Sequence, residues 1–406
     1  MAKKQNCDPC RKNKVGGQAV IEGVMMKRGE KTALASRCDD GTVDIKKNSF
    51  VSVKKKYKIL GIPIIRGVVG FIESMALSFK TMNDSTEALG IEEEEGKAEK
   101  WLKEHLGIKL TDIIMIVAMI LGIALAIGLF FFLPSFIMGF IEDYIARPNG
   151  FTLGRYGKAA IDGAIKVILF ISYLLVVSLM KDIKRVFQYH GAEHKSIACY
   201  EAGMELTPEN ARKCTRFHPR CGTSFMFVMI LIGIFVGMLF PPEWLAWQRA
   251  VAKLCTLPIV MGLGYEFIMF AGKHDNFLTK IMSAPGLWMQ RITTKEPSDD
   301  QLAIAICAIK ASMEEEFPDF DPSEYAIPVE ENTAHIAFTG LKESEKERLI
   351  EKLKLKRARA EWAAENSENT DTSADDFDDT ALDSIDESQE DIEDLKRLDG
   401  AEDDDV

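Results

Sequence analysis

The chain has 406 residues, of which 47% are hydrophobic, and it contains apolar runs near and above twenty residues that exclude a purely soluble protein. Its formal net charge of −12 comes from the C-terminal end, because residues 361–406 hold 20 acids against Lys396 and Arg397 and leave the rest at +6. The eight cysteines are scattered, which excludes the dense disulfide framework of a small secreted domain.

The N-terminal part is expected to lie in the cytosol. Residues 1–14 form a basic tail with no apolar stretch after it, so a cleaved signal peptide is not expected. Cys7 and Cys10 form a CxxC motif that suits a metal or a dithiol, although a disordered tail is favoured. From residue 15 to 65, short apolar runs broken by turns such as Asp40-Gly41 predict a small β-rich segment.

Residues 66–110 are expected to form an amphipathic helix followed by a hydrophilic connector. Apolar residues recur at helical spacing in the first part, at Val69, Ile72, Met75 and Phe79. This pattern predicts a helix that packs on a core or lies on a membrane surface.

A membrane domain is predicted over residues 111–272, with about four transmembrane helices. The first span covers 113–141, with Pro134 as a kink or an exit, and the others cover 161–180, 222–240 and 254–271. The fourth is weaker because it contains Glu266, which either has a functional role or lies in water beyond a shorter span.

Lysine and arginine in the short loops predict the orientation of the spans. The loop 181–221 carries eight of these residues, the loop 134–160 carries three, and the loop 241–253 carries two. Because basic loops resist translocation, we expect the loop 181–221 and both termini to be cytoplasmic.

The residues after the fourth span are predicted to lie first at the membrane interface and then outside the membrane. Residues 273–320 suggest an interfacial helix near 277–282, a Pro-Gly turn, and a soluble helix that begins after Ser298. A charged helical segment is expected over 321–360. The acidic tail 361–406 has too little apolar surface to fold and would suit a basic partner.

The densest group of candidate ligands lies in the loop 181–221. On a helix, His190, Glu193 and His194 would share one face, and an HxxEH sequence of this kind can hold zinc with both histidines while the carboxylate acts on water. His218 and Cys221 follow where the loop meets the third span, and either would complete the site. The alternative is that these are interfacial histidines bonded to loop carbonyls.

Other polar residues are weaker candidates. Glu266 and His274 lie at the same predicted membrane face, Arg66 and Glu73 share a helix face and either pair or face solvent or headgroups, and Glu22 lies among glycines that do not form a phosphate loop. The basic residues follow membrane topology, so no nucleic-acid partner is expected.

Several long segments resemble one family. They are GGQAVIEGVMMKRG (16–29), PIIRGVVGFIESM (63–75), YHGAEHKSIACYE (189–201), RFHPRCGTSF (216–225), GYEFIMFAGKH (264–274) and APGLWMQRITTKEP (284–297). This sequence is similar to the YqhQ-like family of bacterial membrane proteins, described as a predicted metal-dependent enzyme. The resemblance implies a multi-span inner-membrane protein and points to His190, Glu193, His194, His218 and Cys221, and more weakly to Glu22, Arg66, Glu73 and Glu266.

The sequence therefore predicts a mainly α membrane protein with a small N-terminal β-containing cytosolic domain and a disordered acidic tail. Its expected partner is the lipid bilayer, and its expected cofactor is a divalent metal, with zinc favoured by Cys221. The leading hypothesis is a cytoplasmic-facing zinc hydrolase. The alternatives are a non-catalytic membrane scaffold and a carrier for a small ion or solute.

Overall fold

The fold is that of a computed structural model. It describes residues 11, 14–88, 110–151, 153–218, 221–241, 243–273 and 277–328, together with 350, 353–354 and 357–358. The predicted acidic tail, the connector from residue 89 to 109 and His274 lie outside these residues. Two compact units are present, Met1–Ser36 with Ile45–Phe320 and Arg37–Asp44 with Asp321–Val406.

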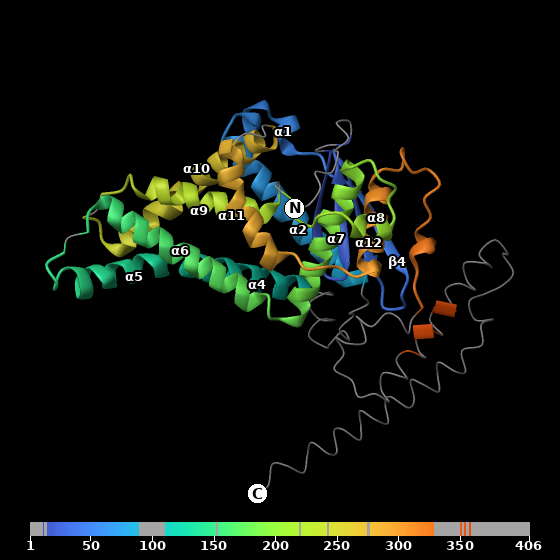
Figure 1. Ribbon diagram of the computed structural model, residues 1–406, viewed down its shortest axis with the longest axis horizontal. Helices are drawn as coiled ribbons and strands as arrows, with labels where there is room; N and C mark the ends of the chain where they lie inside the picture. Colours follow the sequence, from blue (N-terminus) through green and yellow to red (C-terminus); the bar gives the residue numbers. More distant parts are fainter. Residues whose placement is uncertain are drawn as a thin grey trace, which may run out of the picture. The chain divides into compact units, whose positions relative to one another are not determined.

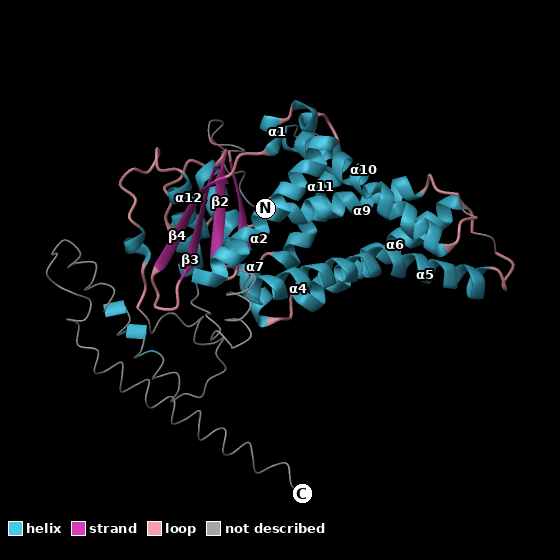
Figure 2. Cartoon of the chain, turned by 180° about the vertical axis from the view of Figure 1, so that it is seen from behind, coloured by secondary structure: helices cyan, strands magenta, loops and turns pink. Residues whose placement is uncertain are grey.

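The predicted sheet is present near the N-terminus (Figure 2). Its four antiparallel strands follow chain order: β1 (Val15–Val20), β2 (Gly23–Arg28), β3 (Lys31–Arg37) and β4 (Val43–Ser49). The turn between β3 and β4 contains Gly41 at a φ of 81°, a left-handed conformation that glycine adopts without a steric penalty. The predicted Asp40-Gly41 turn is therefore observed.

Helices cover both faces of this sheet. Val20, Met25 and Leu34 pack against Leu77 and Met82 of α2 (Ile65–Ala88). The opposite face packs against α7 (Lys181–Glu201) and α12 (Asp299–Ser312), which lie beside β1 and β2 (Figure 2). Burial on both faces explains why β2 reads as a continuous apolar run rather than an alternating one.

The expectation of strands as far as residue 65 is wrong. Residues 53–65 instead contain a short helix α1 (Val53–Lys56), a 3₁₀ turn η1 (Lys58–Gly61) and the start of α2. Ser52 caps α1 by accepting a hydrogen bond from the Lys54 amide at 3.3 Å. Apolar residues in this stretch are exposed rather than paired in a sheet, among them Ile59, Ile62 and Ile65.

Three helical segments are long and apolar enough to cross a membrane: Val117–Ala146, Arg155–Val177 and Ala246–Phe270. The first joins α4 (Leu110–Ile127), η2 (Gly128–Phe132), α5 (Leu133–Phe140) and η3 (Ile141–Ala146). The π-helical segment η2 precedes Pro134, whose missing amide proton disturbs the regular helical bonds. The chain is thus membrane-associated.

The other helices of the membrane part are α6 (Arg155–Val177), α9 (Gly222–Gly237) and α10 (Ala246–Lys273) (Figure 1). The apolar helix α9 has only 16 residues, fewer than the roughly 20 that a straight span requires. It packs between α6 and α10 and also against α11 (Phe277–Thr293). The expectation that residues 222–240 form the third of four spans therefore stays a prediction.

The predicted Pro-Gly turn at residues 285–286 is absent, because α11 runs through it. Gly286 permits close packing of α11 on α9: a Cβ at this position would lie 2.6 Å from the Ser224 hydroxyl. Met289 joins Phe170, Leu174 and Phe227 in a buried cluster of α6, α9 and α11. Tertiary packing therefore overrides the local turn preference of proline and glycine.

The soluble helix α12 begins as predicted. Ser298 accepts a hydrogen bond from the Gln301 amide at 3.3 Å, and the Gln301 side chain accepts one from the Ser298 amide at 3.0 Å. This capping box fixes the N-terminus of a helix that is buried along most of its length.

Hydrogen bonds to backbone carbonyls join the two segments of the second unit. The Arg37 guanidinium donates hydrogen bonds to the carbonyls of Gly41 (2.9 Å) and Tyr325 (2.7 Å). The Ile327 amide donates to the Gly41 carbonyl at 3.0 Å.

Candidate functional site

The candidate site is built on α7, where the HxxEH residues lie on a regular helix. Its first turn carries Asp182, a favourable charge near the positive end of the helix dipole. Residues from Tyr189 onward are largely buried against β1 and α12. This packing holds the rings of His190 and His194 with their centroids 4.4 Å apart, as expected for residues four apart on one helix.

A third ligand comes from a different element. Cys221 is the N-terminal cap of α9, and its sulfur lies 3.2 Å from Nε2 of His190. One ligand atom from each of His190, His194 and Cys221 lies within 4.8 Å of the other two. Zinc forms bonds of roughly 2.0 to 2.3 Å to such ligands, so small side-chain rotations bring all three into range. The two histidines and the thiol therefore fit a zinc ion.

Hydrogen bonds to backbone carbonyls fix the tautomers of both histidines. Nδ1 of His190 lies 2.8 Å from the Thr293 carbonyl, and Nδ1 of His194 lies 2.5 Å from the Arg216 carbonyl. A carbonyl only accepts hydrogen bonds, so each Nδ1 carries a proton, and in the neutral form of each ring the lone pair is on Nε2. Metal-binding histidines commonly have this arrangement, because the second bond orients the ring.

The Thr293 carbonyl is placed by a close backbone crossing. The Lys295 amide donates a hydrogen bond to the Phe187 carbonyl at 2.8 Å, which joins the segment after α11 to α7. A Cβ on Gly191 would collide with the Lys295 carbonyl. Glycine at this position therefore allows the crossing that orients His190.

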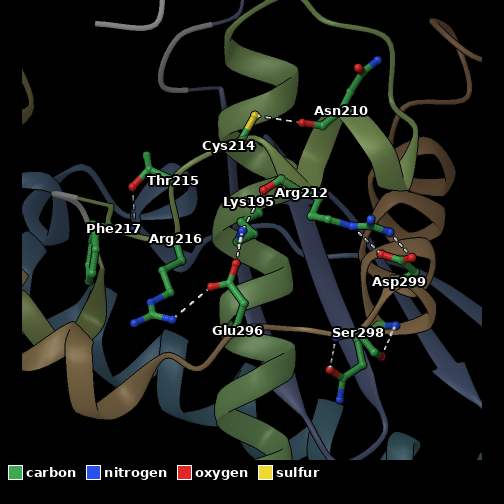
Figure 3. Close-up of polar contacts among 11 residues, drawn as sticks. Lys195, Asn210, Arg212, Cys214, Thr215, Arg216, Phe217, Glu296, Ser298 and Asp299 are labelled. Carbon is green, nitrogen blue, oxygen red and sulfur yellow. Dashed lines mark hydrogen bonds and ion pairs between the residues drawn. The ribbon is translucent and has the colours of Figure 1, made fainter. Parts of the chain in front are cut away.

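Ion pairs of nearby side chains hold the backbone segment that carries the Arg216 carbonyl (Figure 3). Glu296 pairs with Lys195 of α7 and with Arg216, the second at 3.0 Å. Lys195 also donates a hydrogen bond to the Arg212 carbonyl at 2.9 Å (Figure 3). The Glu296 carboxylate thus ties the 212–216 loop to α7, next to His194.

Gln290 of α11 fixes the backbone of His218. Its amide oxygen accepts a hydrogen bond from the His218 amide at 2.8 Å, and its amide nitrogen donates to the His218 carbonyl at 2.6 Å. The Gln290 side chain is fully buried and also donates to the Ser224 hydroxyl at 3.1 Å. The His218 ring lies 5.5 Å from that of His194 between centroids, and it is not part of the His190, His194 and Cys221 group.

Glu193 lies on the same helix face in an unusual environment. Its side chain is 6% exposed, and none of the described residues forms a hydrogen bond with its carboxylate. Burial raises the pKa of this carboxyl to about 7, and the nearby His190 opposes the rise. Gly17 of β1 leaves room for it, since a Cβ there would lie 2.9 Å from Cγ of Glu193.

These side chains line one cavity of about 650 Å³. His190, Glu193, His194, His218 and Cys221 form its polar end. Residues of β1, α2, α9 and α10 form the remaining wall. The volume falls in the range of small-molecule sites, and the arrangement of few polar groups in an apolar wall is typical of them.

Comparison with known proteins identifies the family. A family model described as "Protein of unknown function (DUF1385)" matches residues 62–315. The "Uncharacterized protein YqhQ" of Bacillus subtilis (strain 168) is 36% identical over 301 residues, which cover 72% of this chain and 89% of that protein. This chain belongs to the DUF1385 family.

The membership confirms the resemblance to the YqhQ-like family, while neither description names an activity. No solved structure matches this DUF1385 protein significantly. A functional argument therefore rests on the site itself.

The weaker candidates that the structure describes in this DUF1385 protein, Glu22, Arg66, Glu73 and Glu266, do not line the cavity. Arg66 pairs with Glu266 rather than Glu73, with Nε and a terminal nitrogen 2.6 and 2.5 Å from the carboxylate oxygens. Glu73 accepts hydrogen bonds from the Ser52 hydroxyl and the Val53 amide and pairs with Lys54. Glu22 accepts hydrogen bonds from Arg185 and from the Tyr189 hydroxyl, which joins the β1–β2 turn to α7.

Sequence reasoning missed Thr293 and Glu296, which help to orient the candidate ligands, and Gln290, which fixes the backbone of His218. All three lie in the segment APGLWMQRITTKEP, which resembles the family. The available signal was Gln290, a polar residue directly after the apolar residues 287–289. The prediction of a Pro-Gly turn, with no helix until after Ser298, hid this signal.

We expect Gly191→Ala to weaken zinc binding and to destabilise the protein. The added methyl group would push the Lys295 carbonyl away, at a cost of about 1 to 3 kcal/mol, and would move the Thr293 carbonyl off His190. Thermal unfolding in detergent and a zinc competition titration measure both effects.

Gly233→Ala is the matched control, because this α9 glycine has no atom within 4 Å of the added methyl group. In a helix, that change is expected to be neutral or to stabilise by up to about 1 kcal/mol. Equal behaviour of the two variants would contradict the crossing at Gly191.

Proposed function

We propose that this protein is a zinc-dependent hydrolase, embedded in the inner membrane, with its active site on the cytoplasmic side. One observation carries the proposal: two histidines with fixed Nε2 lone pairs and one cysteine converge at the polar end of a cavity. Three protein ligands leave the fourth position of a tetrahedral site for water or substrate, the pattern of catalytic zinc. The many basic residues of the 181–221 segment support the cytoplasmic orientation.

His190, His194 and Cys221 would hold the zinc, which would supply activation of water and polarisation of a substrate carbonyl. The chain supplies the other functions. Glu193 lines the same cavity and is the proton acceptor in our proposal. His218 lies beside His194 and closes the polar end, where it can donate a hydrogen bond to substrate.

A carrier or scaffold is less well supported. A carrier built on Glu266 requires a carboxylate that is available to a transported ion. The Glu266 carboxylate instead accepts hydrogen bonds from Nε and one terminal nitrogen of Arg66. A scaffold gives no reason for a buried Glu193 without a hydrogen-bonding partner among the described residues. Both features favour catalysis.

The metal content of the purified protein tests the proposal. We expect one zinc per chain by mass spectrometry after purification in detergent, and loss of this zinc in Cys221→Ser and in His190→Ala with His194→Ala. Cys255→Ser is the matched control, because Cys255 is an exposed residue of α10 outside the cavity, and it should retain zinc.

Two results would overturn the metal site. One is a folded wild-type protein that takes up no zinc even when zinc is added in excess. The other is Cys221→Ser together with the double histidine variant binding zinc as tightly as wild type.

A further inference from the structure

Apart from the candidate zinc ligands, much of the cavity lining is apolar and comes from three helices. Phe71 of α2 and Phe225 of α9 line the cavity with their ring centroids 6.1 Å apart, and Ile268 of α10 adds to the same lining. Gly67 and Gly70 of α2 also line the cavity, and Gly67 lets α2 pack closely on α10, since a Cβ there would lie 2.7 Å from Cβ of Tyr265. A cavity of about 650 Å³ is therefore much larger than the few polar groups at its end require.

The rim of this cavity lies on surfaces suited to lipid rather than water. Met226 lines it and is 45% exposed, one turn into the apolar helix α9. On the α2 side, the rim residue Ser74 lies between Ile72 and Met75, which are 59% and 48% exposed. The predicted apolar stripe of α2 thus faces outward, as expected for a helix at a membrane surface. Exposed apolar side chains at this mouth are what an apolar chain entering from a bilayer would require.

The charges of the side chains that line the cavity disfavour binding of a phosphate group. Neither lysine nor arginine is among the described residues that line the cavity, and its acidic residue Glu193 repels anions. The nearby cations Lys195 and Arg216 are both engaged by Glu296 (Figure 3). Lys54, another cation near the lining, lies beside Gly70 and pairs with Glu73 at 3.5 Å. A phosphoryl group at the reacting centre would therefore lack the cationic side chains that normally bind it.

We propose that the substrate is a membrane amphiphile with a long acyl chain, bound with its chain in the cavity and its ester or amide carbonyl at the zinc ligands. This inference rests on the proposed hydrolase function. Glu193 accepts a proton from the attacking water, whose oxygen bonds to the acyl carbon. The bond from that carbon to the ester oxygen or amide nitrogen breaks, and Glu193 returns the proton to the leaving atom. The products are a fatty acid and an alcohol or amine.

Photolabelling tests chain binding separately from catalysis. The full-length protein is placed in nanodiscs of phosphatidylethanolamine and phosphatidylglycerol with a monoacylglycerol that carries a diazirine in its 16-carbon chain. We expect saturable labelling of α2, α9 and α10 residues that line the cavity, mapped by peptide mass spectrometry. Unlabelled long-chain monoacylglycerol should compete at least tenfold better than its four-carbon analogue or inorganic phosphate.

Met226→Trp should lower this labelling at least fivefold, because the larger side chain narrows the mouth. Phe235→Trp, an exposed change on the same helix outside the cavity, should leave it within twofold. Thermal unfolding confirms that both variants fold, and Ile268→Trp replaces Met226→Trp if that variant does not.

The outcomes separate this inference from the proposed function. Zinc-binding protein whose labelling is weak, unsaturable or equal in the two tryptophan variants overturns the acyl substrate and leaves the metal site standing. Specific labelling of a protein that binds no zinc overturns the hydrolase instead, and with it the ester or amide chemistry inferred here. Saturable labelling that phosphate competes away would also contradict the acyl assignment.

Discussion

Glu193→Gln is expected to lower kcat for hydrolysis of a long-chain acyl ester by roughly a hundredfold to ten-thousandfold, the usual contribution of general acid–base catalysis. Glutamine has nearly the same shape as glutamate but accepts no proton under these conditions. Because Glu193 lies outside the group of three proposed zinc ligands, the variant should keep one zinc per chain. Steady-state kinetics and metal analysis of the same preparation measure both quantities.

The thermal stability of Glu193→Gln, unlike its kcat, should not fall. A buried carboxylate with no hydrogen-bonding partner among the described residues costs free energy whenever it is charged. A neutral amide removes the cost of burying a charge, so Glu193→Gln should unfold at the same temperature as wild type or at a higher one. Lower activity with equal or higher stability is typical of a residue retained for catalysis.

Glu73→Gln is the matched control for this experiment. It makes the same chemical change on α2, where the carboxylate contacts Ser52, Val53 and Lys54 outside the cavity. Its kcat should stay within a few-fold of wild type. Full activity in zinc-loaded Glu193→Gln would rule out Glu193 as the proton acceptor.

The sequence predicts the ligand face well because helical spacing is a local property. His190 and His194 needed only an uninterrupted helix to come together, and α7 supplies it. The position of Cys221 could be predicted only as far as its proximity to the membrane, since its approach to His190 depends on the packing of α9 and α11. The local motif was therefore clear, while the choice between His218 and Cys221 required the fold.

The orienting contacts could not be predicted for a physical reason. Both histidines are held by backbone carbonyls, which every residue carries, so the sequence contains no signal for Thr293 or Arg216 as partners. The apolar stripe of α2 presents a second limit. An apolar face suits a protein core and a lipid surface equally, and only the exposure of Ile72 and Met75 distinguishes them.

Glu296→Ala is expected to weaken zinc binding by about tenfold to a hundredfold, although Glu296 is not a ligand. Its carboxylate holds both Lys195 and Arg216, and the Arg216 carbonyl orients His194 (Figure 3). Without it, the 212–216 loop loses its tie to α7, and Lys195, whose side chain is 5% exposed, loses its counter-charge. A competition titration with a zinc-binding fluorophore measures the affinity.

Asp299→Asn separates this positioning effect from a general loss of surface charge. Asp299 forms an exposed ion pair with Arg212 on the same side of the loop, and pairs of this kind contribute about 0 to 1 kcal/mol (Figure 3). Because the Arg216 carbonyl keeps its place in this variant, zinc affinity should stay within about threefold of wild type, with at most a small loss of stability from the first turn of α12. If both variants weakened zinc binding equally, the effect would come from the net charge around the site, and Glu296 would have no specific role in orienting His194.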